Sequence, residues 1–115
     1  MIWPFKQERR HFSRRAIRLD VMFGPSPPLT LTTSVDMSAH SLAFRCARPL
    51  PIGSELEVQV LLDPRHPDSG WFYAKANVMR YDAGVVAVEF TSVSGEDERK
   101  IDLFFSRMED IQPAQ

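Results

Sequence analysis

Short runs in which apolar and polar residues alternate are the feature that most limits how this chain folds. From Ile17 to Phe23 every second residue is apolar, which is the period of a strand with one buried face. Turn-forming residues follow this run (GPSPP), and a later DAG turn contains Gly84, which is suited to a positive φ. The runs that predict strands are residues 17–23, 29–35, 42–47, 56–62, 71–81 and 85–90. Six short strands at this spacing are typical of a small, mainly β, antiparallel barrel.

The last part of the chain has a helical period instead. Ser94 followed three residues later by Asp97 is typical of a capped helix start. Apolar residues then recur at helical spacing, namely Ile101, Phe104, Phe105 and Met108. They predict one amphipathic C-terminal α-helix of about four turns. Packing on the barrel is the favoured interpretation of its aromatic residues, and an exposed contact surface is the alternative.

Length and composition fit one domain. The chain has 115 residues, of which 43% are hydrophobic and 25% charged, enough for one core and too few for two domains. No apolar run reaches the ~20 residues that cross a bilayer, and the initial MIWPF lacks the features of a secretion signal. We therefore expect a cytoplasmic protein without membrane insertion. The expected parts are a flexible basic arm, the barrel with its helix, and a tail, over residues 1–16, 17–110 and 111–115.

The motifs of common enzymes and metal sites are absent from the sequence. His11, His40 and His66 lie far apart, and none has another ligand-type residue at metal-binding spacing. There is no phosphate-binding glycine loop and no nucleophile motif. The single cysteine, Cys46, excludes an internal disulfide and is expected to be a buried structural thiol. We expect no catalysis and no metal site.

Positive charge is concentrated near the start of the chain. The segment ERRHFSRR, residues 8–15, contains four arginines, although the net charge of the whole chain is −1. A protein that binds nucleic acid over a broad face is usually basic throughout. The local cluster therefore indicates an anionic partner that binds at one place on the surface.

Two short motifs occur in order on this strand pattern. Arg10 and Arg14 form an RxxxR, and Asp36 and Ser38 belong to DMSAHS, which follows the expected second strand. Alone, a basic run is commonly a solvated arm and Asp-x-Ser is commonly a turn. Together with the segments PLPIGSELEVQVLL, AKANVMRY and VVAVEF, they resemble the PilZ domain, the bacterial receptor for cyclic di-GMP. The resemblance covers residues 8–108 and implies a six-stranded barrel followed by a helix.

The resemblance also implies a ligand site. Arg10 and Arg14 correspond to the arginines of the family motif and would bind the phosphates or stack on the guanines. Asp36 would accept hydrogen bonds from guanine, and Ser41 stands where the family loop, [D/N]xSxxG, has glycine. The candidate ligand-binding residues are Arg9, Arg10, Arg14, Asp36, Ser38 and Ser41.

The implied function is a cyclic di-GMP receptor that needs no other cofactor. Ligand binding would change the conformation of the arm and pass a signal to an effector protein, for instance in motility, pilus or biofilm control. One alternative is a degenerate PilZ domain that binds no cyclic di-GMP and acts as a protein-interaction adaptor, for which Ser41 is the main argument. The other is a small nucleic-acid-binding barrel, which is disfavoured because Phe12 is the one aromatic residue among the basic residues of the segment ERRHFSRR. MIWPF is a further candidate contact surface for a partner protein.

Overall fold

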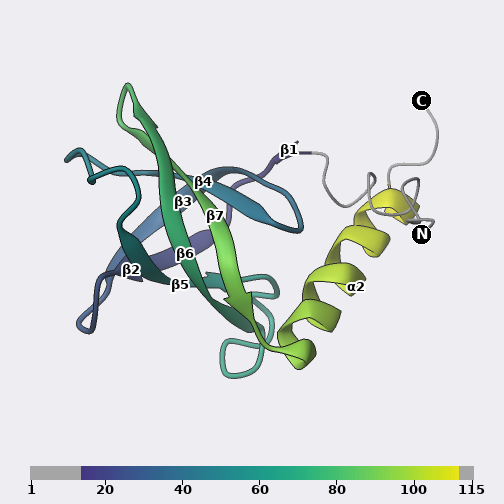
Figure 1. The fold of residues 1–115 in the computed structure, drawn as a ribbon. Coiled ribbons are helices and arrows are strands. Elements are labelled where there is room, and N and C mark those ends of the chain that lie inside the picture. The colour runs from purple at the N-terminus through teal and green to yellow at the C-terminus, as the bar shows by residue number, and fades with distance from the viewer. Residues whose placement is uncertain (1–13, 112–115) are drawn as a thin grey trace, which may run out of the picture.

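The computed structural model describes residues 14–111, with side chains as far as Met108, as a β-barrel followed by a helix (Figure 1). The elements are β1 (Arg15–Ala16), β2 (Asp20–Gly24), β3 (Thr30–Met37), β4 (Ser41–Arg45), β5 (Glu55–Leu61), β6 (Trp71–Asp82), β7 (Val85–Val93) and α2 (Gly95–Ile111). The predicted fold class, a six-stranded antiparallel barrel with a C-terminal helix, is confirmed. The structure adds one short strand, β1, within the range that the sequence assigns to the arm.

The barrel closes through β3. The strand order is β1-β3-β2-β5-β6-β7-β4, and a further pairing of β3 with β4 completes a ring of six antiparallel strands. β1 is outside this ring and pairs with the end of β3, Arg15 with Met37 and Ala16 with Asp36. The main chain of the predicted arm therefore reaches the barrel at its last residues.

The core fills the inside of the ring. Leu56, Val58 and Val60 alternate with partly or fully exposed residues along β5, as the period of the sequence predicts. Phe44 and Phe72 are fully buried, and each such side chain stabilises the fold by roughly 1.5–3 kcal/mol. Alternation along the sequence thus reports which face of each strand points inward.

The hairpin between β6 and β7 has a two-residue turn. Asp82 pairs with Val85, and the residues between them, Ala83 and Gly84, have φ values of 53° and 81°. Positive φ at both positions is the requirement of a type I′ turn, whose twist matches that of the strands. The positive φ predicted at Gly84 is confirmed, whereas that of Ala83 has no signal in the sequence.

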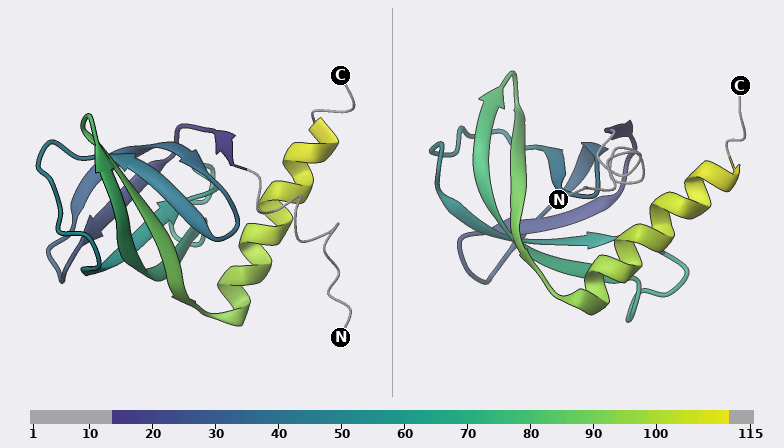
Figure 2. Two further views of the ribbon diagram at one scale, coloured as in Figure 1. Left: turned by 45° about the horizontal axis from the view of Figure 1, so that its top comes forward. Right: turned by 45° about the vertical axis from the view of Figure 1, so that its right-hand side comes forward.

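The helix α2 is capped as predicted and packs beside the end of the barrel (Figure 2). The Asp97 N–H donates to Ser94 Oγ at 3.1 Å, while the Asp97 carboxylate accepts from the Tyr73 N–H of β6 at 2.9 Å. Asp97 therefore takes part in the cap and also ties the helix to the barrel. Ile101 and Phe105 are buried in the core, which confirms core packing for part of the apolar stripe.

Cys46 is partly buried against the core, so the expectation of a buried structural thiol is met only in part. β4 ends at Arg45, one residue before the cysteine. The thiol lies beyond the strand, where Sγ is 3.1 Å from the carbonyl oxygen of Arg48.

Candidate ligand-binding site

Asp36 is turned outward by an irregularity in the pairing of β3 with β4. The register shifts between Ser34 and Asp36, because Val35 is an extra residue on β3 that forms a β-bulge. In an uninterrupted strand, Ser34 and Asp36 would share the inward face. With the bulge, Ser34 is buried and the side chain of Asp36 is 30% exposed.

Arg14, the residue before β1, contacts this carboxylate. Because Arg15 pairs with Met37, Arg14 lies beside the loop that follows β3. Its Nε donates to Asp36 Oδ1 at 2.8 Å, and Nη2 is 2.6 Å from the same oxygen. Nη1 donates to Ser41 Oγ at 2.7 Å. The guanidinium therefore spans from the end of β3 to the start of β4.

Ser38 organises the loop between these two strands. It is buried, and its Oγ accepts from the N–H groups of His40 at 3.2 Å and Ser41 at 3.1 Å. The Oγ atoms of Ser38 and Ser41 are 2.7 Å apart. A hydroxyl has one donor and two acceptor positions, so Ser38, which already accepts twice, donates its proton to Ser41.

Ser41 fits its position without backbone strain. It lies in β4, paired with Glu89, and its φ is not positive. Its Oγ accepts from Ser38 and from Arg14, so within the described residues its own O–H has no acceptor. The serine in the glycine position of the motif thus extends the hydrogen-bond network.

We call Arg14, Asp36, Ser38 and Ser41 the Arg14 cluster, and three of its polar groups retain hydrogen-bonding capacity. Arginine has five N–H groups, and the contacts of Arg14 use at most three of them. Oδ2 of Asp36 has no hydrogen bond with the described residues. Together with the Ser41 O–H, the cluster offers cationic donors, an acceptor and a hydroxyl within a small area.

The structure brings together part of the residue set predicted from the sequence. The predicted residues that are in contact are Arg14, Asp36, Ser38 and Ser41. Arg9 and Arg10, like MIWPF, lie outside the described residues. The sequence placed Asp36 in a loop, and this is wrong, because β3 continues to Met37 and holds Asp36 by pairings on both of its edges.

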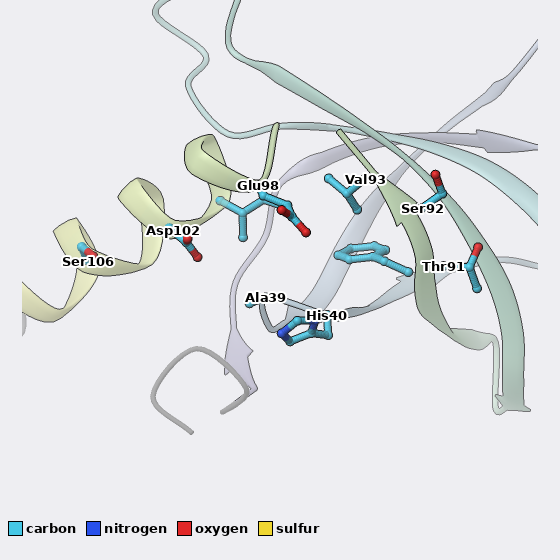
Figure 3. A pocket seen from close by; sticks show the side chains of 10 residues that line it. Ala39, His40, Thr91, Ser92, Val93, Glu98, Asp102 and Ser106 are labelled. Carbon is cyan, nitrogen blue, oxygen red and sulfur yellow. The ribbon is translucent and has the colours of Figure 1, made fainter. Parts of the chain in front are cut away.

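A pocket that nothing in the sequence predicts adjoins the cluster. It has a volume of about 460 Å³ and lies between the β3–β4 loop, the end of β7 and α2 (Figure 3). His40 lines it from the loop, and Glu98 and Asp102 line it from the helix. The spacing of Glu98 and Asp102, four residues apart, indicates that they share a helix face, but nothing in the sequence indicates that the face borders the loop.

The described part of the chain has neither a metal-binding cluster nor a membrane-spanning helix. Among the described side chains, which end at Met108, no three His, Cys, Asp or Glu groups lie together so as to hold a metal ion. In the same part of the chain, no helix has the length and apolar character needed to cross a membrane.

Several solved structures share this fold. The inhibitor of motility MotI/DgrA of Bacillus subtilis is 19% identical with a TM-score of 0.74, over 88% of this chain and 51% of that chain. The PilZ domain of Escherichia coli YcgR, solved with c-di-GMP, is 16% identical with a TM-score of 0.64, over 90% and 95%. The PilZ domain of CeSA from a cellulose-synthesizing bacterium is 15% identical with a TM-score of 0.64, over 84% and 98%.

These likenesses show the fold, and the chain spans about half the length of the Bacillus protein. No curated protein sequence matches the chain. The family model of the PilZ domain matches residues 8–107, a range that includes the RxxxR motif, the barrel and most of the helix. The chain therefore belongs to the PilZ domain family.

Proposed function

We propose that this protein is a cyclic di-GMP receptor that transmits ligand binding to a partner protein. The observation that carries the proposal is the Arg14 cluster, in which a guanidinium, a carboxylate and two hydroxyls are bonded to one another beside a pocket. Cyclic di-GMP presents phosphodiester anions and guanine edges, and these groups require the donors and acceptors that the cluster leaves unused.

Arg14 is the proposed phosphate ligand. Its contacts with Asp36 and Ser41 fix the plane of the guanidinium and leave N–H groups for a phosphate oxygen. A pre-oriented guanidinium loses little further entropy when it binds, and its bonds to phosphate are charge-assisted. Arg10, the other arginine of the family motif, and Arg9, its neighbour in the sequence, supply the remaining positive charge in this proposal.

Asp36 is the proposed guanine ligand. Its Oδ2 would accept from the N1–H and the exocyclic amine of guanine, while Oδ1 keeps its contact with Arg14. The Ser41 O–H would donate to a phosphate or carbonyl oxygen of the ligand. Guanine is selected because a carboxylate repels bases that present acceptors at those atoms.

One observation favours a second function, a protein-interaction adaptor that binds no cyclic di-GMP. The Arg14 guanidinium is already paired with the Asp36 carboxylate, so the two charges largely cancel in the ligand-free protein. Attraction of a dianionic ligand then depends on Arg9 and Arg10. Both the receptor and the adaptor function require an effector protein, and neither specifies the pathway in which that protein acts.

Calorimetric titration of the full chain with cyclic di-GMP tests the proposal. We expect binding to cyclic di-GMP and none to GTP or linear pGpG, because those ligands lack the paired cyclic phosphodiesters. Arg10→Ala and Arg14→Ala should abolish binding, and Asp36→Ala should weaken it. Arg18→Ala, an exposed cation four residues after Arg14, is the matched control and should bind like the parent.

The result also separates the two functions. If the parent shows no heat and no shifted backbone amides with cyclic di-GMP, the adaptor function replaces the receptor. If the parent binds and every variant binds equally well, the ligand site lies elsewhere on the chain.

A further inference from the structure

A second concave surface lies on the side of α2 that faces the loop between β5 and β6. We call it the loop–helix groove; it has a volume of about 550 Å³ and lies between residues 62–70 and the C-terminal half of α2. Helix residues 100, 103, 104, 107 and 108 line it, which is one face at helical spacing. The first pocket is lined by a different face of the same helix, residues 98, 101, 102 and 106.

The loop wall of this groove is held in one shape by its own polar groups. Asp63 accepts from the backbone N–H of Arg65 at 3.0 Å and from its Nε at 3.1 Å, and lies 3.0 Å from His66 Nδ1. Gly70 packs so closely that a Cβ there would be 2.3 Å from the Asp63 carbonyl oxygen. The hydrogen bonds of Arg65 and then of His66 hold the pKa of the Asp63 carboxyl well below its usual range.

The loop is also tied to the helix. Lys100 Nζ of α2 donates to the carbonyl oxygens of Ser69 at 3.1 Å and Trp71 at 3.0 Å. The Trp71 Nε1–H donates to the Pro67 carbonyl oxygen at 2.8 Å. Because both walls are fixed relative to each other, the groove exists before any partner binds, and a partner would not have to order it.

The lining of the groove is largely apolar and open to solvent. Leu103 is 52% exposed, and the next residue of the helix, Phe104, is half-buried. Met108 and Leu62 are also half-buried and extend the same surface. Contiguous apolar side chains on a preformed concave surface are typical of a docking site, since covering them removes apolar area from water.

The charges at the rim are predominantly positive. Arg107 is exposed and makes no ion pair with the described residues, and the side chain of Arg65 is 77% exposed. The carboxylate among the lining residues, Asp63, pairs with Arg65, so these two charges offset each other and Arg107 retains its charge for a partner. A partner that fits this rim carries acidic groups next to its apolar ones.

We propose that the loop–helix groove is a docking site for a partner protein, which it binds through a short segment with large apolar side chains flanked by Asp or Glu. The apolar side chains occupy the space over Leu103, Phe104 and Met108, and a carboxylate of the segment pairs with Arg107. This interaction does not depend on cyclic di-GMP, because the groove is lined by a different helix face from that of the pocket beside the Arg14 cluster.

A phage-displayed library of random short peptides, selected on the full chain, tests the proposal. We expect enriched peptides to combine large apolar residues with Asp or Glu, and to shift the amide signals of residues 62–70 and 100–108 in heteronuclear NMR spectra. Leu103→Glu should lower the affinity for the enriched peptides by about tenfold or more, and Arg107→Glu should lower it by about fivefold. Leu103→Ser serves as a second variant, should the charge at position 103 affect folding.

Matched control variants are available for both positions. Met79 on β6 is 52% exposed, as is Leu103, and Met79→Glu should leave peptide binding unchanged. Arg99 is an exposed cation on α2 outside the groove lining, and Arg99→Glu should also have no effect. Equal losses in the controls and the groove variants would overturn the proposal.

Three other outcomes of this experiment would also overturn the proposal. They are the absence of any enriched peptide, an enrichment of basic peptides, and amide shifts confined to other parts of the chain. Sedimentation with phosphatidylcholine vesicles that contain phosphatidylglycerol is run in parallel. Vesicle binding that is lost in Leu103→Glu would assign the groove to an anionic lipid surface instead of a protein.

Discussion

The Arg14 cluster leaves polar groups without partners among the described residues, whereas most polar groups around the loop–helix groove are bonded to one another or to the main chain. At the cluster, N–H groups of Arg14, an oxygen of Asp36 and the Ser41 O–H are left without partners among the described residues. At the groove, Lys100 is bonded to carbonyl oxygens, and what remains open is apolar surface with the exposed Arg107 at its rim. Unused polar groups suit a small polar ligand, and a rigid apolar surface suits a macromolecule. One helix separates the two kinds of surface.

The largest effect that we expect concerns the geometry of Arg14. Arg14→Lys keeps the charge but cannot reach Asp36 and Ser41 and a phosphate at once, because lysine has no planar fork. Cyclic di-GMP affinity should fall about 100-fold, for two lost charge-assisted hydrogen bonds of about 1.5 kcal/mol each. Calorimetry measures this loss. Arg107→Lys at the groove should retain peptide binding, because a single charge is enough there. If Arg14→Lys retains cyclic di-GMP binding equally well, the proposed difference between the two sites is wrong.

The next largest effect is on the stability of the fold. Of the two binding sites, only the groove should be affected. In Gly70→Ala the new Cβ would lie 2.3 Å from the Asp63 carbonyl oxygen and 2.7 Å from that of His66, so the loop must shift. Overpacking of this kind costs about 2 kcal/mol, measured as a lower midpoint of chemical unfolding. Gly95→Ala is the control, because a Cβ there meets nothing within 4 Å. Groove peptides should bind Gly70→Ala more weakly, while cyclic di-GMP affinity stays unchanged.

A smaller effect concerns Ser41. Ser41→Gly restores the residue of the family motif, but it removes the acceptor of Arg14 and Ser38 and the free O–H. We expect cyclic di-GMP to bind about fivefold more weakly, for one lost hydrogen bond of about 1 kcal/mol. Ser26→Ala, at an exposed serine outside the cluster, should bind like the parent. Tighter binding by Ser41→Gly would show that Ser41 obstructs the site.

The smallest effect is a titration at the groove. The pKa of Asp63 is lowered from 3.8, so its contribution to loop stability is present above pH 3.8 and is lost as the pH falls below that value. NMR titration of the Asp63 carboxyl carbon should give a midpoint below 3.8. Arg65→Ala should raise the midpoint more than His66→Ala does, because Arg65 is the larger cause. A midpoint that stays the same in both variants would contradict this network.

The sequence predicted the parts of the fold that follow from local periodicity. Alternation from Leu56 to Val60 and the Ser94–Asp97 cap both correspond to observed elements, because burial and capping act between residues near one another in the chain. The bulge at Val35 left no such signal, since it is defined by the pairing of β3 with β4. The position of Asp36 on a strand was missed for that reason.

The candidate site shows the same division. The motif named Arg14 and Asp36 by resemblance, and in the structure these two residues form an ion pair. The role of Ser41 was not predictable, because it depends on which atoms of Ser38 are already occupied in three dimensions. The loop–helix groove was missed because Lys100 and Trp71 are distant in sequence and neither belongs to a motif.

The ring of six strands is complete without β1, whose pairing within the described residues is with the last residues of β3. The segment that carries Arg14 is thus an attachment to a finished barrel. Its detachment would break the pairings at Arg15 and Ala16 and leave every barrel seam intact. Amide protons in this segment should therefore exchange with solvent through local opening, at a rate independent of global unfolding.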